Sequence, residues 1–284
     1  MSTPRGHHFK SLSAHGFHRV AYREWGDPEN ARVVVCAHGL TRNGRDFDAL
    51  AAAICDRFRV ICPDMPGRGD SEWLRDPNDY GFPAYLTTVT ALLAHARVDR
   101  VAWVGTSMGG LLGMVVAAQP KTPIARLVVN DVGPTIEPAA LARIGMYVGL
   151  DPVFDSFEQL EKHIRDVSAP FGSLSDGQWH ALTESTARRD ASGRWRLKYD
   201  PGIAVPFRAT GGQVGDLWSL WDAISCPTLL VRGAESDLLS TATADAMRAR
   251  GPRPGFVEFP GVGHAPMLLS SEQMAPVIAF LDQA

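Results

Sequence analysis

The sequence predicts an α/β fold, in which a mostly parallel central sheet carries helices on both faces and a helical lid is inserted before the second-last strand. Short apolar runs alternate with amphipathic segments of helical length, which is typical of parallel sheets covered on both sides. One run, Val101–Val104, leads through a glycine-flanked serine into an apolar helix. Roughly eighty residues with helical periodicity then interrupt the alternation, too many for a loop.

The composition is that of a chain that buries a sizeable core. Of the 284 residues, 45% are hydrophobic and 21% are charged, which suits one α/β domain of this length. A net charge of −3 without a basic stripe gives no electrostatic basis for binding nucleic acid or an anionic membrane. We find no signal-peptide or membrane-length apolar run. Cys36, Cys55, Cys62 and Cys226 form no C-x-x-C pair, so we expect reduced thiols in a cytoplasmic protein.

The periodicity of the hydrophobic residues and the positions of turn-forming residues indicate where the strands and helices lie. We expect two antiparallel strands in residues 7–25, joined around Gly16, and a helix that begins with Asp46 as its N-cap. Further strands are expected at 32–37, 58–62, 101–104, 126–131, 226–233 and 256–259, and further helices at 83–96 and 272–283. Residues 1–134 and 216–284 are therefore predicted to form the core, and 135–215 the helical cap.

The segment Gly105-Thr106-Ser107-Met108-Gly109 has the G-x-S-x-G spacing of a nucleophile elbow. In such an elbow a strained turn exposes a serine hydroxyl above the sheet, and glycines stand where strand and helix approach too closely for a β-carbon. The same pattern also arises by chance in ordinary loops. Because a buried strand precedes it and a helix follows, we predict that Ser107 is a catalytic nucleophile.

Two further polar residues follow strands of the predicted sheet, where ligands of open parallel sheets bind. Asp237 follows the strand that ends near residue 233, and His264 follows the last strand. A serine needs a base to take its proton, and that base needs a carboxylate to orient it. We therefore predict a triad of Ser107, Asp237 and His264. Glu235 and Asp131 are the alternative acids, but Asp131 is expected to fix the turn that follows its own strand.

Acyl transfer also requires donors for the oxyanion. The backbone N–H of Met108, at the start of the helix after Ser107, is one candidate, and that of Leu40, after His38-Gly39, is the other. His38 is expected to hydrogen-bond within this loop. Arg68 and Asp70 are expected to pair within theirs.

The ordered motifs His38-Gly39, Asp64–Ser71, Gly105–Gly110, Gly233…Asp237 and Gly263-His264 resemble the α/β-hydrolase fold family in its capped, single-domain form. The resemblance covers essentially the whole chain and implies a serine hydrolase. No His, Cys, Asp or Glu cluster of the sequence has metal-ligand spacing and no Gly-rich loop has the phosphate-binding pattern, so we expect neither metal nor cofactor. Serine at position 107 argues against members that attack with an aspartate. The lid matches the family only in its position, so substrate specificity does not carry over.

We expect a carboxylesterase that acts on a small to medium ester, with a small molecule as its partner. A lactonase, a thioesterase and a carbon–carbon bond hydrolase of the meta-cleavage kind are alternatives within the enzyme class. Members of the last kind typically carry tryptophan after the catalytic histidine, where this chain has Ala265. A hydrolase-fold protein that binds a ligand without turnover is the alternative outside it, although such proteins often lack a triad member.

Overall fold

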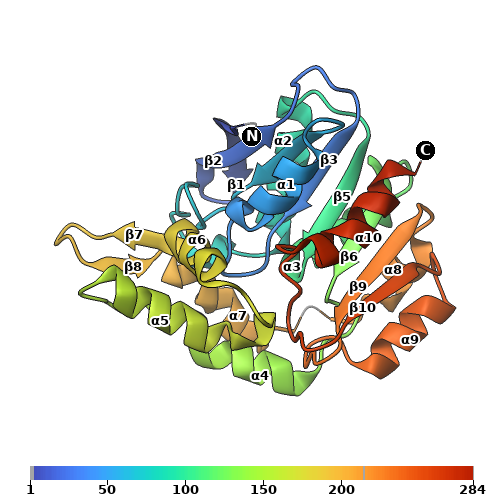
Figure 1. Ribbon diagram of the computed structural model, residues 1–284. Coiled ribbons are helices and arrows are strands. Elements are labelled where there is room, and N and C mark those ends of the chain that lie inside the picture. Colours follow the sequence, from blue (N-terminus) through green and yellow to red (C-terminus); the bar gives the residue numbers. More distant parts are fainter. Residues whose placement is uncertain (1–2, 214, 284) are drawn as a thin grey trace.

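The computed structural model describes residues 3–213 and 215–283. Its centre is an eight-stranded sheet with the strand order β1-β2-β4-β3-β5-β6-β9-β10 (Figure 1). The strands are β1 (Arg5–Ser13), β2 (Gly16–Trp25), β3 (Val33–Ala37), β4 (Arg59–Pro63), β5 (Val101–Thr106), β6 (Ile124–Asn130), β9 (Thr228–Gly233) and β10 (Gly255–Phe259). Only the pairs β1–β2 and β2–β4 are antiparallel; the other five are parallel. The predicted fold class is confirmed.

Helices cover both faces of the sheet because its strands are apolar on both sides. In β3, Val33, Val35 and Ala37 belong to one buried cluster, and Val34 and Cys36 belong to the other. The first cluster takes in residues of α2 and α3, and the second takes in residues of α1 and α10. The bounds are α1 (Asp48–Ile54), α2 (Phe82–His95), α3 (Met108–Ala117), α8 (Trp218–Ala223), α9 (Thr241–Ala249) and α10 (Ser271–Asp282).

The first helix begins differently from the sequence prediction. Asp46 does not cap α1: it lies in a short 3₁₀ turn, Gly44–Phe47, and forms an ion pair with Arg42 at 2.6 Å. Asn43 caps that turn by accepting a hydrogen bond from the Arg45 N–H at 3.0 Å. The chain thus enters the helix through a tighter turn, and a nearby guanidinium engages the carboxylate that could have capped it.

The chain between β6 and α8 leaves the sheet and forms a separate layer beside it (Figure 1). It contains α4 (Pro138–Tyr147), α5 (Phe157–Val167), α6 (Asp176–Thr186), β7 (Ala187–Arg189), β8 (Trp195–Leu197) and α7 (Ala204–Thr210). The β7–β8 hairpin was not expected from the helical periodicity. It closes through Asp190, whose carboxylate accepts from the Ser192 and Arg194 N–H groups at 2.9 and 3.1 Å, and through Gly193 at a φ of 82°.

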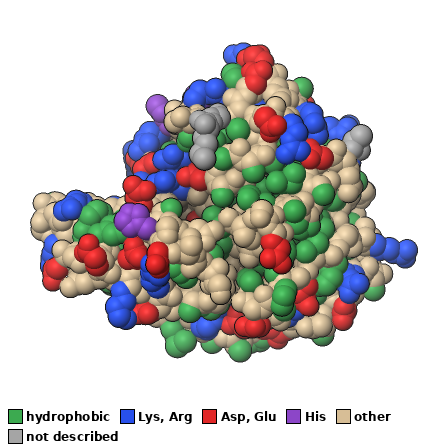
Figure 2. All heavy atoms as spheres, in the orientation of Figure 1, with side chains coloured by type: hydrophobic (Ala, Val, Ile, Leu, Met, Phe, Trp, Pro, Cys, Tyr) green, Lys and Arg blue, Asp and Glu red, His purple; other side chains and the backbone are tan. Residues whose placement is uncertain are grey.

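Charge is distributed evenly over the face shown in Figure 2, where acidic and basic side chains are intermixed. Among the described residues, no helix is long and apolar enough to cross a membrane.

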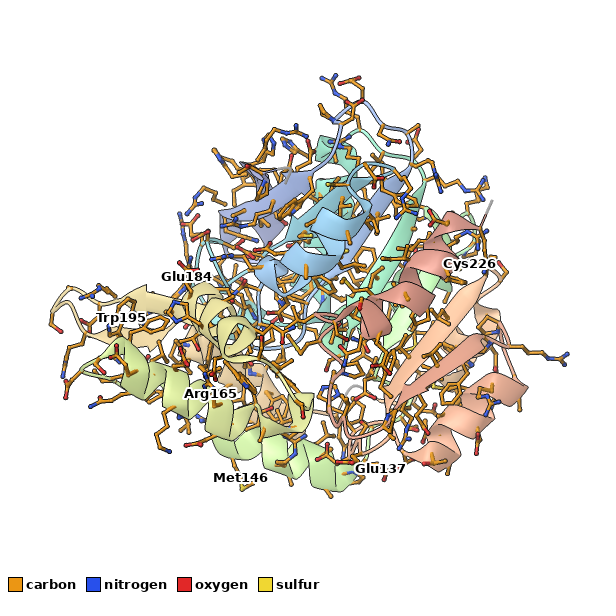
Figure 3. The ribbon with its side chains drawn as sticks, in the orientation of Figure 1. Glu137, Met146, Arg165, Glu184, Trp195 and Cys226 are labelled. Atoms are coloured by element: carbon orange, nitrogen blue, oxygen red, sulfur yellow. The ribbon has the colours of Figure 1, made fainter. Side chains whose placement is uncertain are left out.

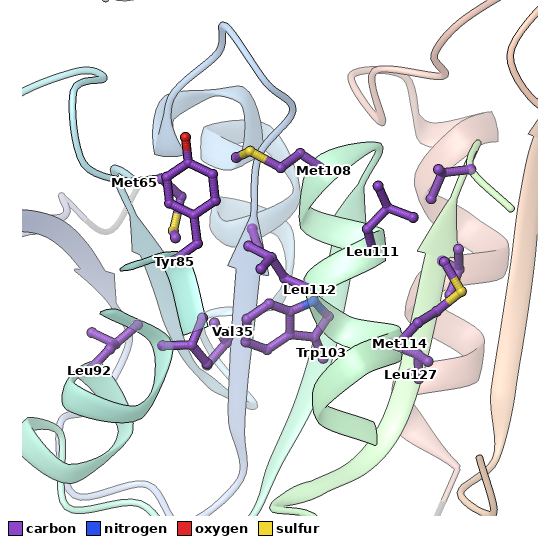
Figure 4. Packing of buried hydrophobic residues seen from close by; sticks show 14 of the residues in the cluster. Val35, Met65, Tyr85, Leu92, Trp103, Met108, Leu111, Leu112, Met114 and Leu127 are labelled. Atoms are coloured by element: carbon purple, nitrogen blue, oxygen red, sulfur yellow. The ribbon is translucent and has the colours of Figure 1, made fainter. Parts of the chain in front are cut away.

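Two glycines allow β3, β5 and α3 to pack as closely as the elbow requires. A β-carbon on Gly105 would lie 2.2 Å from the Gly109 carbonyl oxygen, and one on Gly109 would lie 2.0 Å from the Ala37 carbonyl oxygen. Trp103 of β5 adds a hydrogen bond between the strand and the helix, because its indole N–H donates to the Gly109 carbonyl at 2.9 Å. Figure 4 shows this indole packed beside Leu112 of α3. The elbow is therefore held by backbone contacts that admit no side chain.

We expect Gly109→Ala to lower the free energy of unfolding by about 3 kcal/mol or more, because the added methyl group meets backbone that cannot move aside. Gly177→Ala is the matched control, since a β-carbon there has no neighbour within 4 Å; it should raise stability by up to about 1 kcal/mol. Urea unfolding of both variants is the measurement. Equal stabilities for the two would contradict this account of the elbow.

Candidate active site

Ser107 lies on the turn between β5 and α3 with a strained backbone. Its φ and ψ are 52° and −117°, in the left-handed half of the map that non-glycine residues rarely enter. The Ser107 N–H donates to the Asn130 carbonyl at 2.9 Å, and its own carbonyl accepts from the Leu111 N–H at 3.0 Å. These bonds fix the turn from both sides, so the side chain is held at the carboxyl edge of the sheet.

His264, in the loop after β10, reaches Ser107 directly. Its Nε2 lies 3.0 Å from Ser107 Oγ, and its Nδ1 lies 2.8 Å from Asp131 Oδ2. With a carboxylate at Nδ1, the ring carries its proton there and leaves Nε2 as an acceptor for the serine hydroxyl. The structure thus joins the predicted serine and histidine, and adds an acid that the sequence analysis assigned to a turn.

Asp131 is fully buried at the end of β6, with a φ of 57°. Its Oδ1 accepts from the Gly233 N–H at 3.0 Å, and its Oδ2 accepts from the Ser236 hydroxyl at 2.7 Å. With the bond from His264, the carboxylate has three donors. Such a set satisfies a buried carboxylate and makes it a rigid acceptor for the imidazole.

The prediction of Asp237 as the acid is contradicted by this geometry. Its carboxylate is bound by Arg143 of α4, Nε to Oδ2 at 2.6 Å and Nη2 to Oδ1 at 2.9 Å, and its side chain is 46% exposed. Burial opposes its ionisation, but the guanidinium outweighs that effect and holds the pKa of Asp237 below its ordinary value. Glu235, the other alternative, is exposed.

The error has a physical reason. β6 and β9 are adjacent, so the loops that follow them end at the same edge of the sheet and both bring a carboxylate there. Spacing along the chain does not say which carboxylate faces the imidazole. A usable signal was Asn130-Asp131 directly after an apolar strand, since asparagine and aspartate tolerate the left-handed conformation that turns such a side chain back over the sheet.

The candidate oxyanion loop is held by a buried, neutral histidine. His38 Nε2 accepts from the Met65 N–H at 2.9 Å, so the ring proton is on Nδ1 and is donated to the Gly39 carbonyl at 2.7 Å. Burial lowers the pKa of His38 to about 3. With the Gly39 carbonyl turned toward His38, the N–H of Leu40 in the same trans peptide points the opposite way. Leu40 and Ser107 both line the pocket described below.

Arg68 supports the same loop through the Leu40 carbonyl. The predicted pair of Arg68 and Asp70 is not formed. Asp70 instead meets Lys198 of the lid segment at 2.5 Å. Arg68 is fully buried; its Nε donates to the Leu40 carbonyl at 2.8 Å, and its Nη1 donates to Tyr85 Oη at 2.8 Å. The buried cation also lies 5.0 Å from the Tyr85 ring centroid, a contact that offsets part of its desolvation.

A pocket opens above the serine between the core and the lid. Its floor includes Leu40, Ser107 and His264. Its walls come from α4, α5 and the segment around Pro170 and Phe171, so the lid forms most of the surface that a substrate would meet. Met108, the second predicted oxyanion donor, is the first residue of α3 and lies beside this floor.

These features define a hydrolase fold with a serine–histidine–carboxylate hydrogen-bond series beneath a capped pocket. The chain belongs to the alpha/beta hydrolase family, whose model matches residues 34–280. It is similar to the 3-hydroxybutyrate-oligomer hydrolase of Cupriavidus necator, at 47% identity over 100% of this chain and 99% of that protein. The chain is therefore an enzyme of the carboxylesterase-like type.

Two solved structures are similar over their whole length. An alpha/beta hydrolase from Novosphingobium aromaticivorans is 37% identical with a TM-score of 0.89 and covers 100% of both chains. A putative hydrolase from Rickettsia typhi is 30% identical with a TM-score of 0.91 and covers 99% of both. Both alignments also cover the segment between β6 and α8.

The buried His38 makes stability depend on pH. The unfolded chain binds a proton at this residue below an ordinary pKa of 6.5, whereas the folded protein does so only near 3. Its contribution is complete above pH 6.5 and is lost as the pH falls. We expect it to lower the free energy of unfolding by about 2 kcal/mol between pH 7 and pH 5.

Urea unfolding of the parent and of His38→Gln at both pH values measures this contribution, because the other histidines titrate equally in the two proteins. The loss on acidification should be smaller in the variant by the amount given. An identical loss in both proteins would show that His38 is not held neutral.

Proposed function

We propose that this enzyme hydrolyses carboxylic esters through an acyl-enzyme on Ser107, with His264 as base and Asp131 as the acid that orients it. The observation that carries the proposal is the uninterrupted series of hydrogen bonds, 3.0 Å from Ser107 Oγ to His264 and 2.8 Å from His264 to Asp131. A serine hydroxyl becomes a nucleophile near neutral pH only with such a base.

In the first half-reaction Ser107 Oγ attacks the ester carbonyl while His264 Nε2 takes its proton. The N–H groups of Leu40 and Met108 donate to the oxyanion that forms. When the tetrahedral intermediate collapses, His264 returns the proton to the leaving alkoxide, which departs as an alcohol. A water molecule then repeats the sequence on the acyl-enzyme and releases the acid. Asp131 keeps the imidazole in the required tautomer and stabilises its positive charge.

The substrate class we propose is a short linear oligomer of 3-hydroxybutyrate, a chain of esters between a hydroxyl and a carboxyl end. The 3-hydroxybutyrate-oligomer hydrolase of Cupriavidus necator is 47% identical to this chain over 100% of this chain and 99% of that protein. The pocket walls support a substrate that is apolar along most of its length, since Ile144, Ile164, Val167 and Phe171 line them. The residue after His264 is the buried Ala265, which gives no support to carbon–carbon bond hydrolysis.

Two aspartate variants test the acid. We expect Asp131→Asn to lower kcat on p-nitrophenyl butyrate by about 10⁴, because the amide favours the wrong imidazole tautomer. Asp237→Asn should cost less than about tenfold, because its carboxylate contacts no reacting group. Ser107→Ala sets the background rate. The reverse order of the two aspartate effects would return the acid to Asp237.

The substrate class is tested by product analysis. We expect the 3-hydroxybutyrate dimer and trimer to be cleaved to monomer, with measurable turnover of p-nitrophenyl butyrate as well, because the same acyl chemistry serves both. A 2-hydroxy-6-oxo-dienoate is the comparison substrate. A kcat/KM for the dienoate above that of every ester would contradict an esterase.

A further inference from the structure

Arg143 of α4 is one of the two arginines among the residues that line the pocket. On α4, Arg143, Ile144 and Tyr147 line the pocket, whereas Met146 is 72% exposed and points away from the molecule (Figure 3). This spacing turns one face of α4 toward Ser107 and the opposite face to solvent. The guanidinium of Arg143 therefore belongs to the pocket wall.

The two arginines that line the pocket differ in where their carboxylate partners lie. Arg42 forms a two-point ion pair with Asp46, and both residues line the pocket, so together they present no net charge to it. Arg143 forms the equivalent pair with Asp237, which is outside the set of lining residues. Arg143 therefore lines the pocket, whereas its carboxylate partner does not.

The pair also fixes the direction of the guanidinium. Asp237 binds Nε and Nη2, the edge that a bidentate pair uses, and Nη1 forms no part of that pair. Arg143 also has a side-chain hydrogen bond with Tyr147, another residue of the pocket lining. A guanidinium carries five N–H donors, so it can serve both of these partners and still donate to a second carboxylate. Arg143 is in this respect a preorganised donor, because its main rotational freedom has already been lost.

We propose that Arg143 binds the free terminal carboxylate of the substrate, so that the enzyme removes hydroxyacid units one at a time from the carboxyl end of an oligomer. This inference rests on the proposed function and names the end of the chain that is recognised. It is a binding role: Arg143 does not contact the reacting atoms.

The position relative to His264 agrees with that role. The leaving group is the part of the ester that His264 protonates, so it lies on the His264 side of the scissile bond. Asp237 is close enough to His264 for their charges to interact, and Arg143 is bound to Asp237. In a 3-hydroxybutyrate ester only two carbons separate the ester oxygen from the next carboxyl group. When the leaving unit is the last one, that group is a free carboxylate.

The balance of the reaction is that of ester hydrolysis. The bond between the acyl carbon and the oxygen of the terminal unit breaks, and that oxygen receives its proton from His264. One 3-hydroxybutyrate leaves with its carboxylate intact, and water then releases the shortened oligomer, whose new terminal carboxylate binds in the next cycle.

The test compares the 3-hydroxybutyrate dimer as the free acid with its methyl ester, using Arg143→Gln. We expect the parent to prefer the acid and the variant to lose about 10- to 100-fold in kcat/KM on the acid, mostly through KM, as for one lost hydrogen bond to a charged group. The loss on the methyl ester should be under about threefold. Arg165→Gln is the matched control, because Arg165 of α5 (Figure 3) pairs with Glu161 and Asp176 and is not among the residues lining the pocket.

A second measurement does not require the oligomer to be a substrate. Free 3-hydroxybutyrate should inhibit p-nitrophenyl butyrate hydrolysis competitively, with an inhibition constant raised by Arg143→Gln and unchanged by Arg165→Gln. Equal losses on acid and methyl ester, or an unchanged inhibition constant, would overturn the carboxylate site while leaving the esterase intact. If the parent cleaves p-nitrophenyl butyrate but neither dimer, the substrate class fails and the terminal-unit mechanism fails with it.

Discussion

The site depends on one buried carboxylate. Asp131 is fully buried, and its two oxygens accept from the Gly233 N–H, the Ser236 hydroxyl and His264. These donors come from the last residue of β9 and from the loops after β9 and β10, so one side chain connects the ends of three neighbouring strands. A buried charge is costly unless it is fully hydrogen-bonded. Three hydrogen bonds offset this cost. The one to His264 also sets the position and tautomer of the imidazole beside Ser107, so the fold and the proposed chemistry depend on the same carboxylate.

The loop on the opposite side of Ser107 is held by two buried side chains, the neutral His38 and the cationic Arg68. His38 holds the Gly39 carbonyl and accepts from the Met65 backbone, and the buried Arg68 holds the Leu40 carbonyl. Both anchor the loop through its carbonyl oxygens, which leaves the N–H of Leu40 available to a ligand. A positive charge behind that loop also favours negative charge in front of it. The proposed oxyanion donor of this loop would thus be held in place before a substrate binds.

The sequence predicted the sheet and its helices because apolar runs and breaks have a fixed period, and it predicted Ser107 because the glycine spacing is imposed by backbone contacts. The acid and the hairpin required information that is not local. Two carboxylates follow adjacent strands, and only the three-dimensional direction of each loop decides that Asp131 faces His264 while Asp237 faces Arg143. The β7–β8 hairpin escaped detection for a related reason, since three-residue strands are too short to show a period.

The lid is attached to the core by different kinds of contact along its length. Near α6 and the segment after β8, it is tied by buried bonds, from Asn43 to the Ser185 carbonyl at 2.9 Å and from Tyr80 to Asp200 at 2.6 Å. At α4 the tie is the partly exposed pair of Arg143 and Asp237, and such pairs contribute little to stability, at most about 1 kcal/mol. α4 also packs the buried side chains of Ala140 and Ile144 into the main core cluster, so the ion pair adds a polar contact to an element that is already held by apolar packing. A ligand carboxylate that binds Arg143 would therefore meet a guanidinium whose helix and side chain are both already in place, so little further ordering would oppose its binding.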